Sequence, residues 1–171
     1  PESVDFVDNP YFAKPEAERQ LFGEDAGDID VPEWSSFPEV PEDFEVRKRG
    51  KTTLNADEER QLFLRYNYAR YRLSRLAEGQ QRRFGKKRAG EMVLWFGRAQ
   101  ACRSQLVRSN MALVLAMAKR TRIANVEFSE LVSEGNMALL RSVEKFDVTR
   151  GFKFSTYACR AILKSFTRKA K

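Results

Sequence analysis

The stretch that decides the fold runs from Glu127 to Arg168 and reads EFSELVSEGNMALLRSVEKFDVTRGFKFSTYACRAILKSFTR. Its first half repeats apolar residues near the 3.6-residue period of an α-helix, with polar residues between them. The apolar positions are Phe128, Leu131, Val132, Leu139, Val143 and Phe146, and the outward positions are Glu130, Ser133, Glu134, Arg141 and Glu144. This half is predicted to be an amphipathic helix.

The second half contains a glycine turn and then alternates cations and hydroxyls with three aromatic rings. The eight residues concerned are Arg150, Gly151, Phe152, Lys153, Phe154, Ser155, Thr156 and Tyr157. Aromatic rings stack on unpaired bases, and Lys or Arg neutralises the phosphate backbone. The pattern therefore predicts a single-stranded nucleic acid as ligand.

A last helix is expected after this turn, with Ser155 or Thr156 as its N-cap. Its cations recur along one face and its apolar residues along the opposite face. The cations are Arg160, Lys164, Arg168 and Lys171, and the apolar residues are Ala158, Ile162 and Phe166. A cationic stripe alone is typical of a solvated face or of a DNA contact in equal measure; beside the aromatic cluster, DNA is favoured.

The segment LVSEGNMALLRSVEKFDVTRGFKFSTYA resembles region 2, the core- and promoter-binding segment of the housekeeping-type sigma factor family. With Leu106 to Lys119 (LVRSNMALVLAMAK), the resemblance covers residues 106–168. The motifs SN-x-ALV, EGN, EKFD and G-F-K-F-S-T-Y-A occur in the family's order. The resemblance implies an all-α domain that acts without enzymatic chemistry in transcription initiation. Its implied partners are core RNA polymerase and promoter DNA, and an anti-sigma factor is a further candidate partner.

Two sets of site residues follow from the resemblance. Read alone, the outward face of the first helix is a solvated surface. In the family, the matching positions grip the coiled coil of the largest polymerase subunit; here they are Glu130, Ser133, Glu134, Asn136 and Leu140, with Arg141 expected to complement acidic side chains of that partner.

The second set is expected to contact the promoter's minus-ten element. By resemblance, a flipped adenine is held or bordered by Phe146, Arg150, Phe152 and Tyr157. Lys153 is expected to meet phosphate, Ser155 and Thr156 the downstream bases, and Lys164 and Thr167 the upstream duplex edge. Phe154, Arg160 and Arg168 complete the predicted DNA-binding set. Stacking of about 1–3 kcal/mol per base partly offsets the cost of unstacking.

The chain departs from the family at Arg160 and Ala161, where housekeeping members carry two adjacent tryptophans. Without these rings, either melting is weaker or a different minus-ten sequence is read, which favours an alternative member of the family. The family's later helix-turn-helix does not follow within the 171 residues, so a fragment of a longer protein is expected.

Composition narrows the function classes. Residues 1–46 hold fourteen acidic and two basic residues, whereas residues 47–171 hold ten acidic and twenty-nine basic ones. A basic body of this kind is typical of nucleic-acid binding. The chain has no histidine, and Cys102 and Cys159 form no C-x-x-C pair, so no metal, cofactor or His-based catalysis is predicted. Without a membrane-length apolar run or a signal peptide, a soluble, cytoplasmic protein is expected.

The expected organisation is an acidic arm and basic linker over residues 1–51, followed by one domain of four to six helices over residues 52–171. The arm holds all six prolines, and only Pro15–Phe22 is predicted to be a short helix. Two alternatives remain for it: a mostly disordered, solvating segment, or a segment whose many aromatics fold over the basic body or over a polymerase surface.

Two further features lie between the arm and region 2. A helix is expected from about Ala56 to Ala77. The cationic stretch Gly79–Gly90 is then either a solvated loop or helix end, which could touch DNA non-specifically, or a specific phosphate contact.

Two rival functions remain on the sequence alone. The first is a sequence-independent single-stranded nucleic-acid binder that uses the same aromatics without polymerase. The second is a sigma-like decoy that occupies polymerase but fails to open promoters, because Arg160 and Ala161 replace the tryptophans.

Overall fold

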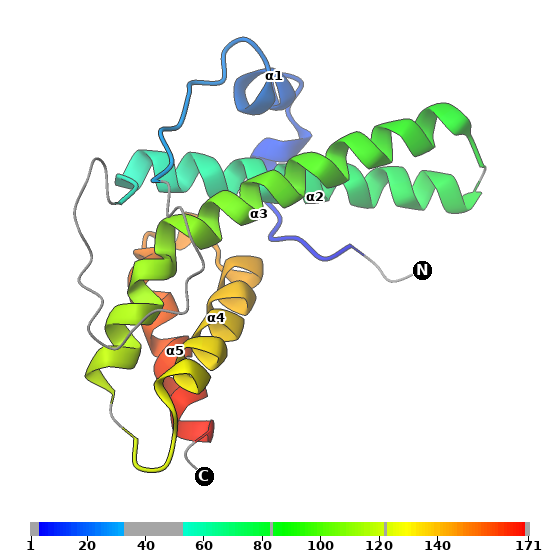
Figure 1. Ribbon diagram of the computed structural model, residues 1–171. Coiled ribbons are helices and arrows are strands. Elements are labelled where there is room, and N and C mark those ends of the chain that lie inside the picture. Colours follow the sequence, from blue (N-terminus) through cyan, green and yellow to red (C-terminus); the bar gives the residue numbers. More distant parts are fainter. Residues whose placement is uncertain (1–3, 33–52, 83, 122, 170–171) are drawn as a thin grey trace. The chain divides into compact units, whose positions relative to one another are not determined.

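The computed structural model describes residues 4–32, 53–82, 84–121 and 123–169, and every regular element within them is helical (Figure 1). The elements are η1 (Pro10–Ala13), α1 (Ala17–Phe22), α2 (Ala56–Arg82), α3 (Lys86–Arg120), α4 (Phe128–Lys145), η2 (Val148–Arg150) and α5 (Phe154–Lys169). The predicted all-α class is confirmed, and the four helices from α2 to α5 agree with the expected four to six.

The chain divides into two compact units. Unit 1 combines residues 1–29 with residues 57–105, and unit 2 combines residues 30–56 with residues 106–171. The helix α3 contributes its first part to unit 1 and its last part to unit 2. This grouping places the beginning of the arm with α2 and the first part of α3, whereas the predicted boundary after residue 51 lies outside the described residues and stays a prediction.

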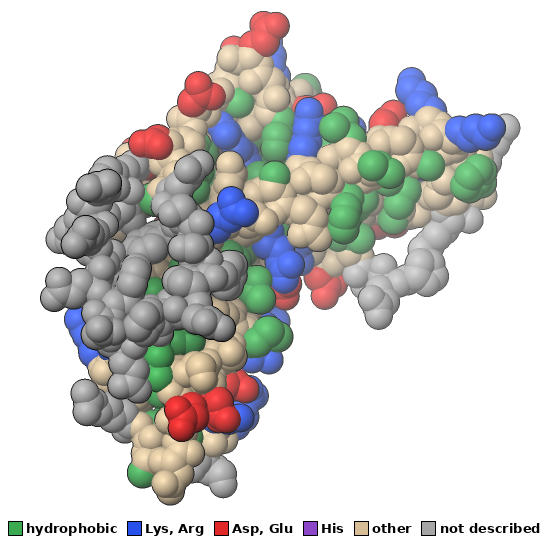
Figure 2. Space-filling model, viewed as in Figure 1, with side chains coloured by type: hydrophobic (Ala, Val, Ile, Leu, Met, Phe, Trp, Pro, Cys, Tyr) green, Lys and Arg blue, Asp and Glu red, His purple; other side chains and the backbone are tan. Residues whose placement is uncertain are grey.

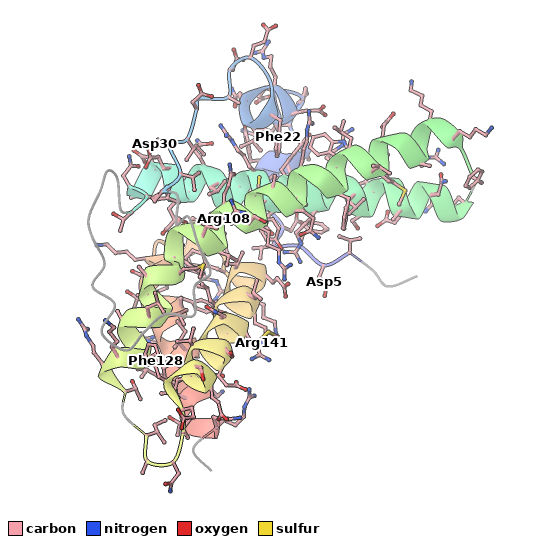
Figure 3. The ribbon with its side chains drawn as sticks, in the orientation of Figure 1. Asp5, Phe22, Asp30, Arg108, Phe128 and Arg141 are labelled. Carbon is pink, nitrogen blue, oxygen red and sulfur yellow. The ribbon has the colours of Figure 1, made fainter. Side chains whose placement is uncertain are left out.

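Unit 1 is built around an aromatic core that joins the arm to α2 and α3. Phe12 packs edge-on against Tyr68 at a ring-centroid distance of 5.6 Å. Phe22 meets Trp95 of α3 edge-on at 5.4 Å, and Trp95 in turn meets Tyr68 at 5.6 Å. Phe12 and Trp95 are almost completely buried. Figure 3 shows Phe22 at the end of α1. Burial of such rings contributes much of the hydrophobic stabilisation of a small unit.

Polar contacts fix the arm in register on α2. The Val7 amide donates to Oδ1 of the buried Asn67 at 2.9 Å, and Asn67 Nδ2 donates to the Phe63 carbonyl at 3.1 Å. The guanidinium of Arg72 pairs with Glu18 of α1 and also lies over the Trp95 ring, 4.9 Å from its centroid. A buried amide with both ends hydrogen-bonded stabilises one arrangement over others.

The arm therefore takes the second of the two alternatives over its described part: residues 4–29 pack on the basic body. The predicted short helix is confirmed, although it begins at Ala17 rather than Pro15. The remaining arm aromatics Trp34, Phe37 and Phe44 lie outside the described residues, as does the basic linker up to residue 52.

The cationic stretch Gly79–Gly90 forms two helix ends, as one of its two readings expected. The α2 helix starts at Ala56 as predicted but continues to Arg82, five residues beyond the expected end. Two contacts tie the helix ends together: Arg88 Nη1 donates to the Gly79 carbonyl at 2.8 Å, and the Gly85 amide donates to Gln80 Oε1 at 3.2 Å. These contacts satisfy polar groups that a helix end leaves free.

In unit 2, α4 and α5 lie side by side and pack against the last part of α3 (Figure 1). Gly135 of α4 marks the closest approach. A Cβ at this position would lie 2.6 Å from Cγ1 of Val114 in α3 and 3.4 Å from the Phe166 ring in α5. Only glycine allows three helices to meet at this distance.

The predicted faces of α4 and α5 are largely confirmed. Buried residues of α4 include Leu131, Leu139 and Val143, whereas Phe128 and Val132 are half-buried. The apolar face of α5 is buried as expected, through Ala158, Ile162 and Phe166. The predicted N-cap at Ser155 or Thr156 is wrong, because α5 already begins at Phe154 and the Lys153 carbonyl accepts the Tyr157 amide at 3.4 Å.

The described residues carry neither a helix of membrane-spanning character nor a cluster of metal-ligand side chains. No helix among them is long and apolar enough to cross a membrane. Likewise, they contain no group of three or more His, Cys, Asp or Glu side chains that could hold a metal ion. Cys102 is buried, and burial raises the pKa of its thiol to about 11.

Candidate nucleic-acid interface

The turn between α4 and α5 is built by Asp147 and Gly151. The Asp147 side chain caps η2: its Oδ1 accepts from the Thr149 amide at 3.0 Å and from the Thr149 hydroxyl at 2.6 Å. Gly151 has φ of 77°, a left-handed conformation that glycine adopts readily. Together the capped turn and the glycine direct the chain outward at Phe152, which is 70% exposed.

The charge of Asp147 is stabilised within this turn. Burial alone would raise the pKa of the carboxyl, but hydrogen bonds from Thr149 and the nearby guanidinium of Arg150 outweigh it and hold the pKa below its ordinary value. The Arg150 Nε lies 3.4 Å from Oδ2 of Asp147. The same ion pair therefore restrains Arg150, a predicted DNA-binding residue, beside the turn.

The aromatic residues of the predicted site divide into an inner and an outer pair. Phe146 and Phe154 lie in the core, 3% and 0% exposed, and their rings meet edge-on at 5.2 Å. Tyr157 rests on Phe146 at 5.4 Å and remains 39% exposed, and Phe152 is exposed. The predicted DNA contact of Phe154 is therefore not available in this structure, because α5 begins at this residue and turns its ring inward. Phe146 lies beneath Tyr157 and supports it.

An open groove of about 710 Å³ runs between α4 and α5. Four cations line it, and they come from both helices. The lining residues are Ala138, Arg141, Ser142, Lys145, Tyr157, Ala161, Lys164, Ser165, Thr167 and Arg168. The hydroxyl groups of Ser142 and Thr167 donate to backbone carbonyls of their own helices. The groove thus presents mainly cationic donors, which suit phosphate or the acceptor edge of a base.

The groove brings together some of the predicted residues and separates others. Lys164, Thr167 and Arg168 meet there as expected, whereas Arg160 is exposed outside its lining. Arg141, predicted on the polymerase face, projects from α4 (Figure 3) and lines this groove instead. Lys145 was missed by the sequence reasoning, although its position one helical turn after Arg141 is a usable signal.

Ala161, one of the two residues that stand where housekeeping members carry tryptophans, lines the groove. A methyl side chain leaves this part of the groove open. Lys153 and Thr156 are exposed beside the turn, and Ser155 is half-buried. Lys171, the last cation of the predicted stripe, lies outside the described residues.

The second predicted face lies on the outer side of α4. Glu130 and Ser133 are exposed, and Glu134, Asn136 and Leu140 are half-buried. Met137 lies among them and is 52% exposed. Sequence reasoning did not select Met137, although it follows Ser133 and Glu134 by four and three positions and so shares their face.

Both carboxylates of this face contact the last two turns of α5. Oε2 of Glu134 accepts from the Ser165 hydroxyl at 2.9 Å and lies 3.9 Å from Arg168 Nη2. Oε2 of Glu130 lies 3.5 Å from Lys169 Nζ. Such half-exposed ion pairs contribute little each, about 0–1 kcal/mol. They do connect the acidic face of α4 directly to the basic helix α5.

Part of this chain is similar in sequence to known proteins. Residues 106–171 match the family described as Sigma-70 region 2. The RNA polymerase sigma factor SigA of Lactococcus lactis subsp. cremoris is 44% identical over 70 residues, which are 41% of this chain and 19% of the relative. The protein of the same description from Lactococcus lactis subsp. lactis (strain IL1403) is also 44% identical over 70 residues, or 18% of its length. The chain thus spans about a fifth of the curated relatives it matches. Residues 106–171 are therefore similar in sequence to the sigma-70 region 2 family, and this similarity covers less than half of the chain.

Proposed function

We propose that this chain acts in transcription initiation as a segment of a sigma factor. In this proposal, the outer face of α4 binds core RNA polymerase, and the turn with α5 captures single-stranded DNA of the promoter's minus-ten element. The chain acts by binding alone, carries out no covalent chemistry, and works in the cytoplasm with the polymerase. Its domain for this purpose is the helical body after the arm.

The observation that carries the proposal is the position of two exposed rings beside a cationic groove. Tyr157 of α5 lines the groove with Arg141, Lys145, Lys164 and Arg168, and Phe152 is exposed in the turn just before α5. An unstacked base gains about 1–3 kcal/mol by stacking on a ring, and the cations neutralise the adjoining phosphates. Such an arrangement fits a strand whose bases have left the duplex.

The polymerase contact is proposed for Glu130, Ser133, Glu134, Asn136 and Leu140, with Met137 added from its exposure. The partner surface is proposed to be the coiled coil of the largest subunit. Arg141 and Lys145 are assigned to the DNA side, since both line the groove. An anti-sigma factor that competes for the same α4 face is compatible with this assignment.

The test is binding of purified bacterial core RNA polymerase to the full chain, followed by binding of a single-stranded minus-ten oligonucleotide to the complex. We expect Glu134→Lys and Asn136→Ala to weaken polymerase binding. Asp28→Lys, an equal charge reversal on an exposed residue of unit 1, is the control and should bind like the wild type.

Three outcomes separate the proposal from its rivals. If the wild type does not bind core polymerase but binds single-stranded DNA without sequence preference, the chain is a general single-strand binder. Wild type that binds polymerase yet fails to open duplex promoters supports a decoy, with Arg160 and Ala161 as the reason. Polymerase-dependent selection of one minus-ten sequence supports the proposed sigma function.

A further inference from the structure

A group of exposed apolar side chains in unit 1 is not explained by the surfaces described above. Eight large hydrophobic side chains are exposed in the described residues, and four of them lie between residues 84 and 96. They are Phe84, Val93, Leu94 and Phe96, which are 75%, 73%, 51% and 53% exposed. Contiguous apolar groups at the surface of a protein commonly mark an interaction site.

The exposed side of α3 has the spacing of a helix-packing seam. Gly90, Leu94, Gly97, Ala101 and Ser104 recur at alternating intervals of four and three residues, and all five are exposed. Val93 lies beside this seam, whereas Phe96 lies further round the helix. A Cβ built at Gly90 or Gly97 meets no atom within 4 Å. Residues at this spacing face a second helix in paired helices, and small side chains let its backbone come close.

Most of the charges around the seam favour an acidic partner. Arg82, Lys86 and Lys87 are exposed at the end of the α2–α3 hairpin, and α3 has no acidic residue in its first turn. Figure 2 shows hydrophobic side chains along α3 and basic ones at the hairpin end. The N-terminus of a helix adds further positive potential. The nearest acidic residue of α3, Glu91, is half-buried.

These features select among the possible occupants. A nucleic acid would satisfy the cations but would leave Val93 and Leu94 uncovered. A lipid surface would gain nothing from the glycine spacing. A second copy of this hairpin would bring the same excess of cations, with only Glu78 and the half-buried Glu91 near the hairpin end to meet them. An acidic amphipathic helix satisfies both the apolar seam and its charges.

We propose that this face of α3, formed by Gly90, Val93, Leu94, Gly97 and Ala101, binds an acidic amphipathic helix of core RNA polymerase. It is a second docking surface, separate from the α4 face. The choice of polymerase rests on the proposed function, in which polymerase is the protein partner of this chain. The cations Lys86 and Lys87 align with carboxylates of the docked helix.

The experiment measures the affinity of the full chain for purified core RNA polymerase. Leu94→Glu is expected to weaken binding by about tenfold or more, because it places a charge in the apolar seam. Its control is Gln61→Glu, which adds the same charge at an exposed position of α2 and should bind like the wild type. The double variant Lys86→Glu, Lys87→Glu should weaken binding severalfold and reduce its dependence on salt. Circular dichroism checks that each variant keeps its helices.

The outcomes distinguish this inference from the proposed function. If wild type binds polymerase and Glu134→Lys weakens it, but Leu94→Glu and the double lysine variant bind like Gln61→Glu, the inference is overturned and the proposed function stands. If wild type does not bind polymerase, both fail. If Leu94→Glu abolishes only self-association, or only binding to anionic vesicles or duplex DNA, that other occupant replaces the polymerase helix and overturns the inference.

Discussion

The hydroxyl group of Ser165 in α5 donates a hydrogen bond to Oε2 of Glu134 in α4 at 2.9 Å. The carboxylate proposed to meet the polymerase is thus held by the helix proposed to meet DNA. Arg168 approaches the same oxygen at 3.9 Å. The two proposed surfaces share one anchored side chain and are not independent patches.

Ser165→Ala should lower the free energy of unfolding by about 0.5–1.5 kcal/mol, the usual net worth of one hydrogen bond. Urea unfolding measures this change. In a double-mutant cycle, Ser165→Ala should cost less in a Glu134→Gln background, because the charged acceptor is already gone. Ser133→Ala on the exposed side of α4 is the control, with an expected change within about 0.5 kcal/mol. Equal costs of Ser165→Ala in both backgrounds would contradict the contact.

Gly135→Ala should destabilise unit 2 by about 1–3 kcal/mol, the typical cost of overpacking. Its methyl group would lie 2.6 Å from Cγ1 of Val114, so α3 or α4 must shift. Gly97→Ala is the matched control, because a Cβ there meets nothing and alanine favours the helix by up to about 1 kcal/mol. Thermal unfolding of both variants should therefore move in opposite directions. A neutral Gly135→Ala would argue against the close three-helix contact.

Phe12→Ala should destabilise unit 1 by about 3–5 kcal/mol, because the ring is 4% exposed and packs on Tyr68. Phe84→Ala makes the same chemical change at a ring that is 75% exposed, and it should alter stability by no more than about 0.5 kcal/mol. Thermal unfolding followed by circular dichroism compares the two. Similar effects of both substitutions would mean that the arm does not pack on α2.

Phe152→Ala and Phe154→Ala should separate DNA binding from stability. Phe152 is exposed, so its removal should weaken single-strand binding by about 1–3 kcal/mol and leave the unfolding temperature nearly unchanged. Phe154 is fully buried, so its removal should cost about 3–5 kcal/mol of stability. Oligonucleotide titration and thermal unfolding give the two readouts. The reverse assignment of effects would refute the described orientation of the turn.

Asp147→Asn should change how stability depends on pH. Because the pKa of Asp147 is lowered in the folded chain, its charge stabilises the fold above the ordinary aspartate value of about 3.9, and this contribution disappears as pH falls through the lowered pKa. The wild type should therefore be more stable than Asp147→Asn at pH 7, and the difference should vanish in strong acid. Denaturant unfolding across pH measures it.

Thr149→Val tests the cause of that pKa shift. It removes the hydroxyl that donates to Asp147 Oδ1 at 2.6 Å but keeps the backbone amide. In the Thr149→Val background, the difference in free energy of unfolding between Asp147 and Asp147→Asn should be smaller. An unchanged difference would assign the shift to the backbone amide and Arg150 instead.

Local periodicity predicted α4 and α5 well. Each helix buries one continuous apolar face, and the spacing of apolar residues along the sequence shows where that face lies. It did not predict which ring of the Phe152 and Phe154 pair turns inward. That choice depends on the left-handed Gly151 and on where α5 begins, and neither is encoded in the alternation of aromatics and cations.

The local sequence pattern also could not predict where the arm packs. Val7 reaches Asn67 across 60 positions of sequence, and no period in the arm indicates that partner. The groove between α4 and α5 was not predicted from the sequence, although the cations that α5 contributes to it were selected and Lys145 was not. Its inclusion depends on the packing of two helices, which brings side chains of α4 beside those of α5.

The environment of Trp95 gives the molecule an optical property. Its indole is 2% exposed, meets the Phe22 ring at 5.4 Å and is covered by the guanidinium groups of Arg72 and Arg98. The chain has two tryptophans, so a Trp34→Phe background leaves Trp95 as the single indole. Release of the arm would admit water to that ring and shift its emission to longer wavelength. The fluorescence of Trp95 thus reports, in real time and without a label, whether the acidic arm is packed on α2 and α3.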